Sequence, residues 1–135
     1  MTAIDWSRVP RTGIAIIDGQ HRNLVLTVNE LTAAVEEGRG GETLRKILSN
    51  LRLYAQYHFS TEEQLLSRHS WPGLAEHKKH HARFVEALDE FDFEALLDAP
   101  DAAADLLFFL QDWLENHLGT EDVGFSTYLK QAGVS

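Results

Sequence analysis

Four long segments of the chain carry apolar residues at spacings of three and four, and glycine or proline interrupts the sequence between them. Such spacings keep the apolar side chains on one face of an α-helix, so each segment predicts an amphipathic helix. The segments cover about 18–37, 42–68, 73–91 and 101–118. Nothing in the sequence reads as a clear strand. Four helices joined by short connections predict an all-α protein, an up-down-up-down four-helix bundle.

The two ends of the chain lie outside this pattern. Residues 1 to about 17 have no sustained periodicity, and we expect them to form an N-terminal arm. Residues 122–130 predict a short C-terminal helix. A length of 135 residues suits one domain, so we expect a single domain over 1–135.

Composition limits the kinds of site and partner that the chain can have. It contains no cysteine, so nitrogen and oxygen atoms must supply any metal ligands. Its net charge of -9 disfavours nucleic acid and anionic membranes as partners. The N-terminus lacks the basic and apolar regions of a signal peptide, and the longest apolar run, 106–110, is too short to cross a bilayer. We therefore expect a cytoplasmic protein.

Five of the seven histidines lie on the apolar faces of the predicted helices. They are His21, His58, His77, His81 and His117. Glu62 lies four residues after His58 and shares its face. In an up-down bundle the starts of the first and third helices meet the ends of the second and fourth, so these side chains converge on one layer. Asp122 follows the fourth helix, where the chain turns across that end.

Such a layer is too polar to be buried without a ligand. Burying one unpaired polar group costs ~1–3 kcal/mol, and a whole domain is stable by only ~5–15 kcal/mol. Five imidazoles and two carboxylates would offset most of that stability unless a metal satisfied them. Seven side-chain ligands are too many for one ion and suit two. We expect His69 and His80, which fall outside these faces, to lie on the surface.

Four short motifs around these ligands resemble the signature of the hemerythrin family. They are IDGQH at 17–21, HFSTEE at 58–63, EHKKHHARF at 76–84 and WLENH at 113–117, followed by Asp122. The resemblance runs from Trp6 to Leu129 and is greatest to the single-domain prokaryotic bacteriohemerythrins.

The resemblance implies a centre of two iron ions joined by an oxo or hydroxo bridge. It assigns His77, His81 and His117 to one iron and His21 and His58 to the other, with Glu62 and Asp122 bridging them. Dioxygen would bind at an open position of the second iron, in a pocket lined by Leu24, Phe59 and Leu114. The implied function is reversible dioxygen binding for carriage, storage or delivery. It is not enzymatic, although weak peroxidase activity is compatible with such a centre. An oxygen-consuming enzyme would suit it as a protein partner.

Three other functions compete with this interpretation. A ferritin-like di-iron oxidase or peroxidase uses Glu-x-x-His pairs, and the chain contains none. A structural zinc bundle is an awkward fit, because zinc prefers four ligands. An oxygen or redox sensor that signals to a separate partner stays open on the sequence alone.

Overall fold

The structure is a computed structural model that describes residues 3–38, 41–89, 100–118 and 122–135. Its long helices are α1 (Ala15–Glu36), α2 (Gly41–Arg68), α3 (Leu74–Asp89) and α5 (Pro100–Asn116). A short 3-10 helix, η1 (Trp6–Arg8), precedes them, and α6 (Asp122–Gln131) follows them. No strand occurs within the described ranges. The prediction of an all-α protein is therefore confirmed.

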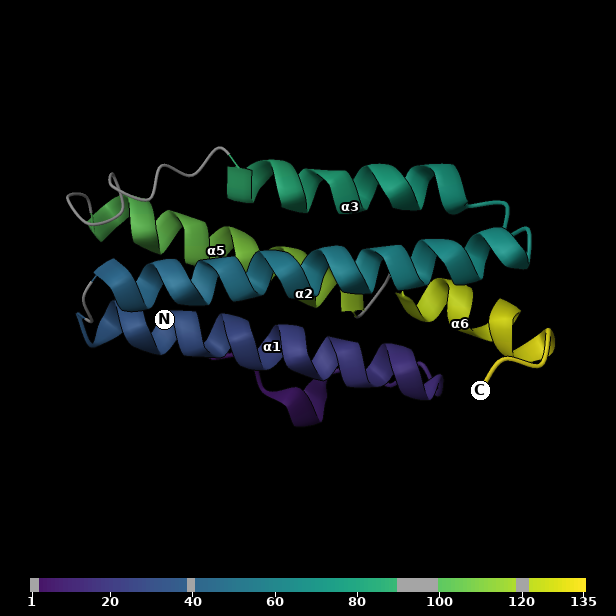
Figure 1. The fold of residues 1–135 in the computed structure, drawn as a ribbon. Helices are drawn as coiled ribbons and strands as arrows, with labels where there is room; N and C mark the ends of the chain where they lie inside the picture. The colour runs from purple at the N-terminus through teal and green to yellow at the C-terminus, as the bar shows by residue number, and fades with distance from the viewer. Residues whose placement is uncertain (1–2, 39–40, 90–99, 119–121) are drawn as a thin grey trace.

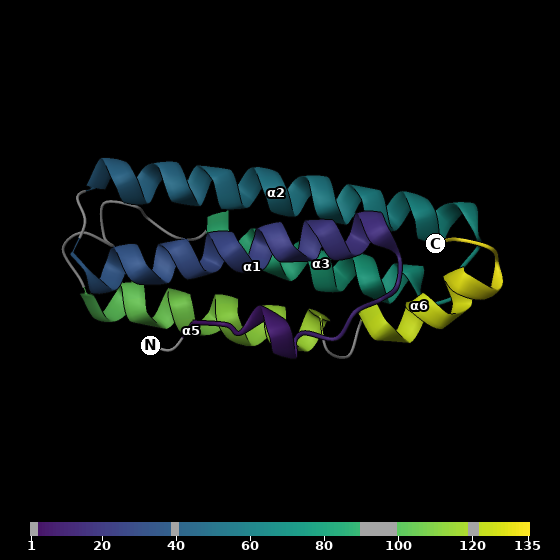
Figure 2. The ribbon, with the colours of Figure 1, turned by 90° about the horizontal axis from the view of Figure 1, so that it is seen from below.

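The four long helices lie side by side, and each runs in the opposite direction to the one before it (Figures 1 and 2). The start of α1, the end of α2, the start of α3 and the end of α5 consequently meet at one end of the bundle. Helix α6 continues beyond α5 at that same end (Figure 1). The predicted up-down-up-down arrangement is thus present, and it fixes where the histidines gather.

Two apolar clusters of different size fill the interior. The main cluster extends along the bundle and includes Leu24, Leu51, Phe59, Phe84, Leu110 and Leu114. The end cluster is small and consists of Ile14, Ile17, Leu66, Phe125 and Leu129. Between them the helices carry polar side chains: on α1 the order is Ile17, His21, Leu24, and on α2 it is Leu66, Glu62, Phe59. The buried polar layer is thus enclosed by apolar packing on both sides.

The N-terminal arm is fixed to the bundle by hydrogen bonds to α1. The side-chain oxygen of Asn29 accepts from the backbone N–H of Ile4 at 2.8 Å, and its amide nitrogen donates to the Ile4 carbonyl at 2.9 Å. The Asp18 carboxylate accepts from the backbone N–H of Thr12 at 2.8 Å and from that of Gly13 at 3.1 Å. These contacts order the segment that carries no helical period in the sequence.

Helix α1 begins at Ala15, three residues before the expected start. Asp18 lies in its first turn, where a carboxylate is favoured by the helix dipole and can bind free N–H groups of the preceding chain. Gly13 has a φ of +80°, a value that suits glycine, and it allows the arm to turn into the helix. The last two residues of the expected third helix, 90–91, lie outside the described residues.

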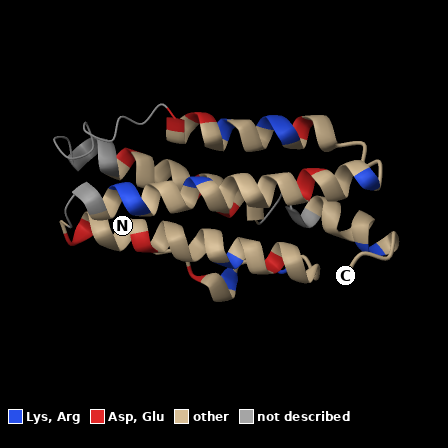
Figure 3. Cartoon of the chain, in the orientation of Figure 1, with Lys and Arg blue, Asp and Glu red and all other residues tan. Residues whose placement is uncertain are grey.

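Charge is distributed along the whole bundle. Acidic and basic positions alternate on the helices without gathering into a basic face in the view of Figure 3. Among the described residues, no helix is both long and apolar enough to span a bilayer.

Candidate metal centre

Each of the four long helices contributes at least one imidazole to a single buried layer. The histidines of the layer are His21 on α1, His58 on α2, His77 and His81 on α3, and His117 at the end of α5. Their exposed fractions lie between 0% and 3%, and Glu62 on α2 is 0% exposed. The residues are spaced so that they stay on the inward faces of their helices, and the alternating helix directions bring them to the same height.

Glu62 lies at the centre of this layer, and the five imidazoles divide between its two oxygen atoms. On one side, Oε1 lies 2.7 Å from Nε2 of His77 and 3.2 Å from Nε2 of His81. On the other side, Oε2 lies beside Nε2 of His58, 3.4 Å from Nε2 of His21 and 3.5 Å from Nε2 of His117. All five rings therefore present the same nitrogen to one carboxylate.

Two overlapping groups of these residues have the spacing of metal ligands. The first comprises His21, His58, Glu62 and His117; the second comprises Glu62, His77, His81 and His117. Within each group the ligand atoms lie within 4.8 Å of one another. Glu62 and His117 belong to both groups, so the two groups overlap around one carboxylate.

The electrostatics of the layer favour the protonation states that bind cations. Burial raises the pKa of Glu62, but the imidazoles of His58 and His117 outweigh it and hold that pKa well below its ordinary value. Burial also lowers the pKa of His81 to about 4, although the neighbouring Glu62 carboxylate opposes this change. A carboxylate anion beside a neutral imidazole is the donor set that a metal ion requires. The residues present therefore fit a bound cation.

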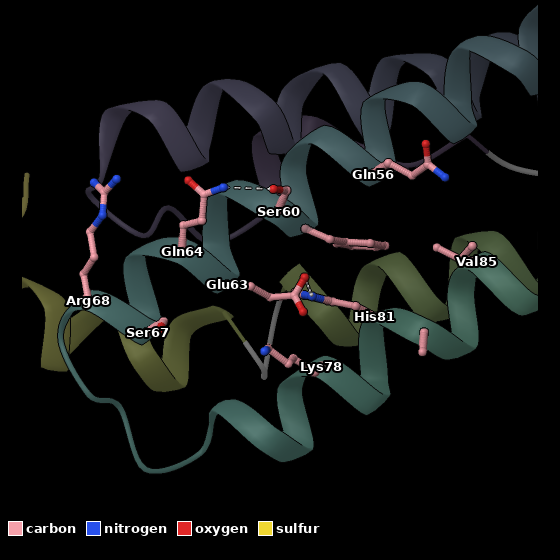
Figure 4. A pocket seen from close by; sticks show the side chains of 11 residues that line it. Gln56, Ser60, Glu63, Gln64, Ser67, Arg68, Lys78, His81 and Val85 are labelled. Atoms are coloured by element: carbon pink, nitrogen blue, oxygen red, sulfur yellow. Dashed lines mark hydrogen bonds and ion pairs between the residues drawn. The ribbon is translucent and has the colours of Figure 1, made fainter.

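Two further polar side chains contact ring nitrogens on the far side from Glu62. Gln20 Oε1 lies 2.9 Å from Nδ1 of His58. Glu63 Oε2 lies 3.8 Å from Nδ1 of His81, and Figure 4 shows these two side chains pointing toward one another from α2 and α3. Burial raises the pKa of Glu63. Such outer contacts orient metal-binding rings in many proteins.

Three apolar side chains were expected to line a pocket beside the centre. Leu24, Phe59 and Leu114 are 0%, 4% and 0% exposed, and all belong to the main cluster. The Phe59 ring is nearer to His81, at 4.0 Å between centroids, than to His58, at 5.7 Å. Phe59 therefore contacts the α3 side of the layer more closely than the His58 side.

Comparison with known proteins agrees with this geometry. The profile of the Hemerythrin HHE cation binding domain matches residues 12–129. The chain is 31% identical over 127 residues to a bacteriohemerythrin of Pseudomonas aeruginosa, covering 93% of this chain and 80% of that one. The chain belongs to the hemerythrin family. It is also 29% identical over 117 residues to a hemerythrin of Themiste dyscrita, with coverages of 87% and 86%. The crystal structure of a hemerythrin mutant has a TM-score of 0.78 at 24% identity, covering 96% of this chain and 98% of that one, and shows the same fold.

Asp122 is the seventh expected ligand. Asp122 begins α6 at the end of the bundle where the layer lies, but its side chain lies outside the described ones. Its assignment as a bridging ligand stays a prediction.

The two histidines expected on the surface differ from one another. His69 follows α2 and is partly exposed, away from the layer. His80 is only partly exposed, and its ring stacks on Trp113 with centroids 4.6 Å apart and an interplanar angle of 17°. Its ring centroid lies 5.3 Å from that of His117. The expectation for His80 is therefore wrong, because its ring packs against Trp113 of α5 beside the layer.

Sequence reasoning gave no role to Gln20 or Glu63, and it gave Trp113 only a place on the apolar face of the fourth helix. Gln20 and Glu63 belong to motifs that carry the family resemblance. Each is the sequence neighbour of an expected ligand and lies outside the apolar face of its helix. Trp113 stacks on His117, with ring centroids 4.6 Å apart and an interplanar angle of 19°. Its position four residues before His117 is the one signal of this contact in the sequence.

Proposed function

We propose that this hemerythrin-family protein binds dioxygen reversibly at a centre of two iron ions, for oxygen carriage, storage or delivery. One observation carries the proposal: five buried imidazoles from four helices surround a single carboxylate and divide between its two oxygen atoms. A carboxylate shared in this way suits a bridge between two cations.

The proposed ligands are divided between two irons as the family resemblance implies. His77, His81 and His117 would hold one iron and His21 and His58 the other, with Glu62 and Asp122 bridging them. His117 belongs to both groups of possible ligands, and its Nε2 lies 3.5 Å from Glu62 Oε2, the oxygen beside His58 and His21. In this division, His21 and His58 give their ion one histidine ligand fewer than the other ion has, so that ion keeps a position for a small molecule. When bound, the pair of irons supplies two electrons to dioxygen and recovers them on release.

The donor set supports iron over the competing metals and chemistries. A zinc site would be complete with four ligands, and each group here shares two of its four members with the other. Ferritin-like oxidation centres are rich in carboxylates. In this layer the described donors are five imidazoles and one carboxylate, a set that favours reversible binding over strong oxidation.

The apolar side chains around the centre have a protective role in this proposal. Leu24, Phe59 and Leu114 are buried beside the histidine layer and exclude water from it. Protons and water promote irreversible loss of an oxygenated state, so apolar side chains that exclude water lengthen its lifetime. In this proposal the chain supplies the ligands and excludes solvent from the centre.

The test is metal analysis combined with optical spectra. We expect about two irons per chain and an absorption change that reverses when the sample passes from air to argon and back. The His58→Ala variant is the matched control, because it keeps the ligands of the other iron and should lose the reversible change. The proposal would be contradicted by one metal ion per chain, by mainly zinc, or by an absorption spectrum that is the same under air and under argon.

A further inference from the structure

Gln20 occupies an unusual place for an uncharged polar side chain. It lies on α1, one residue before His21, and is only 9% exposed. It reaches across to α2, where its Oε1 lies 2.9 Å from Nδ1 of His58. The contact joins two helices directly behind a ring that faces Glu62.

The direction of this hydrogen bond is set by a second contact of the same amide. Nε2 of Gln20 donates to Oγ1 of Thr61 at 3.2 Å. The Thr61 hydroxyl donates its own proton to the carbonyl of Tyr57 at 3.0 Å, so its oxygen is left to accept. An amide nitrogen only donates and an amide oxygen only accepts. With the nitrogen on Thr61, the oxygen faces His58, and Nδ1 of His58 must carry the proton.

We infer that Gln20 and Thr61 are positioning residues that hold His58 as its Nδ1–H tautomer. In that tautomer Nε2 has a free lone pair, and Nε2 is the atom beside Glu62 Oε2. The relay from Tyr57 through Thr61 and Gln20 thus fixes both the rotation and the protonation of one ring. The inference deepens the proposed function and rests on it for the identity of the ion that His58 binds.

The side chain behind the His81 ring is a carboxylate rather than an amide. Its Nδ1 faces the Glu63 carboxylate at 3.8 Å, whereas His58 faces a neutral amide. A carboxylate behind a ring adds electron density to the ligand, and an amide orients the ring with little such effect. The His58 side of the centre is therefore held in place without additional negative charge, which favours the reduced form of its ion.

Three variants separate these effects, and a fourth is the control. Gln20→Leu removes the acceptor, Gln20→Glu keeps an acceptor but adds charge, and Thr61→Val removes the group that orients the amide. Gln64→Leu is the control, because Gln64 is an exposed glutamine of α2 that donates to Ser60 and contacts no ligand of the layer. Iron affinity is measured by competition with a ferrous chelator under argon, and the reduction potential by redox titration.

We expect Gln20→Leu to weaken iron affinity about 10- to 100-fold and Thr61→Val to weaken it less. Gln20→Glu should restore the affinity and lower the reduction potential, because the added negative charge stabilises the ferric state. The control should match the parent in both measurements. Parent-like affinity in Gln20→Leu overturns the inference. So does an equal loss in a well-folded Gln20→Glu variant, since that pattern indicates a role in packing alone.

The outcome for the proposed function is read separately. A parent protein that holds iron but takes up no dioxygen contradicts the proposed function, and the affinity series still decides the role of Gln20. A Gln20→Leu variant that fails to fold, shown by loss of its helical circular dichroism, leaves the decision to Thr61→Val and Gln20→Glu. In that case, parent values of affinity and potential in both remaining variants overturn the inference.

Discussion

The ring of Phe59 stacks on the imidazole of His81, with centroids 4.0 Å apart and an interplanar angle of 11°. Both rings line a groove of about 760 Å³ between α2 and α3, whose rim carries Ser60, Glu63 and Lys78 (Figure 4). Phe59 is 4% exposed, so its inner face belongs to the core and its edge meets the groove. Phe59 and one ring of the histidine layer, His81, thus border the same solvent-accessible groove.

Removing that ring should both destabilise the bundle and admit water. We expect Phe59→Ala to lower the free energy of unfolding by about 3–5 kcal/mol, the usual cost of a large cavity in a core. We also expect the oxygenated form to be lost faster, because water in the groove then has access to more of the layer than the His81 ring. Chemical denaturation and the decay of the oxygenated absorption measure the two effects. A destabilised variant with a parent decay rate would show that water arrives by another route.

A polar substitution at Leu114 tests a second residue of the expected pocket lining. Leu114 lies three residues before His117 and is 0% exposed. Leu114→Asn keeps the volume nearly constant and introduces a hydrogen-bond donor, so we expect near-normal iron content and faster autoxidation. Leu44→Asn is the control, since Leu44 is buried in the main cluster near the start of α2, away from the layer, and should mainly reduce stability. A parent autoxidation rate in a folded, iron-loaded Leu114→Asn variant would remove Leu114 from the pocket wall.

Substitution of single histidines should distinguish the two ions. His77→Ala or His81→Ala removes a ligand from the iron with three histidines, and we expect weak metal loading. His58→Ala should retain some iron and form no stable oxygenated state. His69→Ala is the control and should change neither property, because His69 lies away from the layer. Iron content and spectra under air provide the comparison.

His80→Ala is a separate test of the helical register of α3. The stack on Trp113 should be lost, at a cost of about 0.5–1.5 kcal/mol in stability. Iron content should stay near the parent value, since the His80 ring is not part of either ligand group. An iron defect as large as that of His81→Ala would place His80 among the ligands and contradict the register.

Removal of metal should lower the thermal stability of the whole bundle. Without cations the layer keeps five imidazoles and the Glu62 carboxylate buried, and each unsatisfied group costs about 1–3 kcal/mol. We expect the midpoint of thermal unfolding to fall by at least about 10 °C on chelation. An unchanged midpoint would mean that the layer does not need a cation to be buried.

Sequence periodicity was sufficient for the bundle and for most of the layer. The apolar spacings place His21, His58, Glu62, His77 and His117 on inward faces, and all of them are buried where the pattern predicts. This succeeds because the helical period and the alternating directions depend on local sequence and short connections. The early start of α1 was missed, since it depends on Asp18 binding backbone groups of the arm, which has no period of its own.

Contacts between side chains of different helices could not be predicted from the periodicity of the sequence. His80 lies one position off the inward face of α3, and its ring packs against Trp113 of α5. Gln20 is similar: its role depends on the positions of His58 and Thr61 on a neighbouring helix. A residue next to the apolar face of a helix can point either toward solvent or toward an adjacent helix. Its position in the helical period does not distinguish the two.

The enclosure of the layer by two unequal apolar clusters has a consequence for how ions enter and leave. The end cluster contains Ile14, Ile17, Leu66, Phe125 and Leu129, and much of the main cluster lies deeper in the bundle. A small group of contacts opens at a lower free energy than a large one. Fraying of α6 and the start of α1 would uncover the ligands while the remaining helices stay packed. Iron uptake should therefore follow the local hydrogen-exchange rate of α6 rather than the global rate of unfolding.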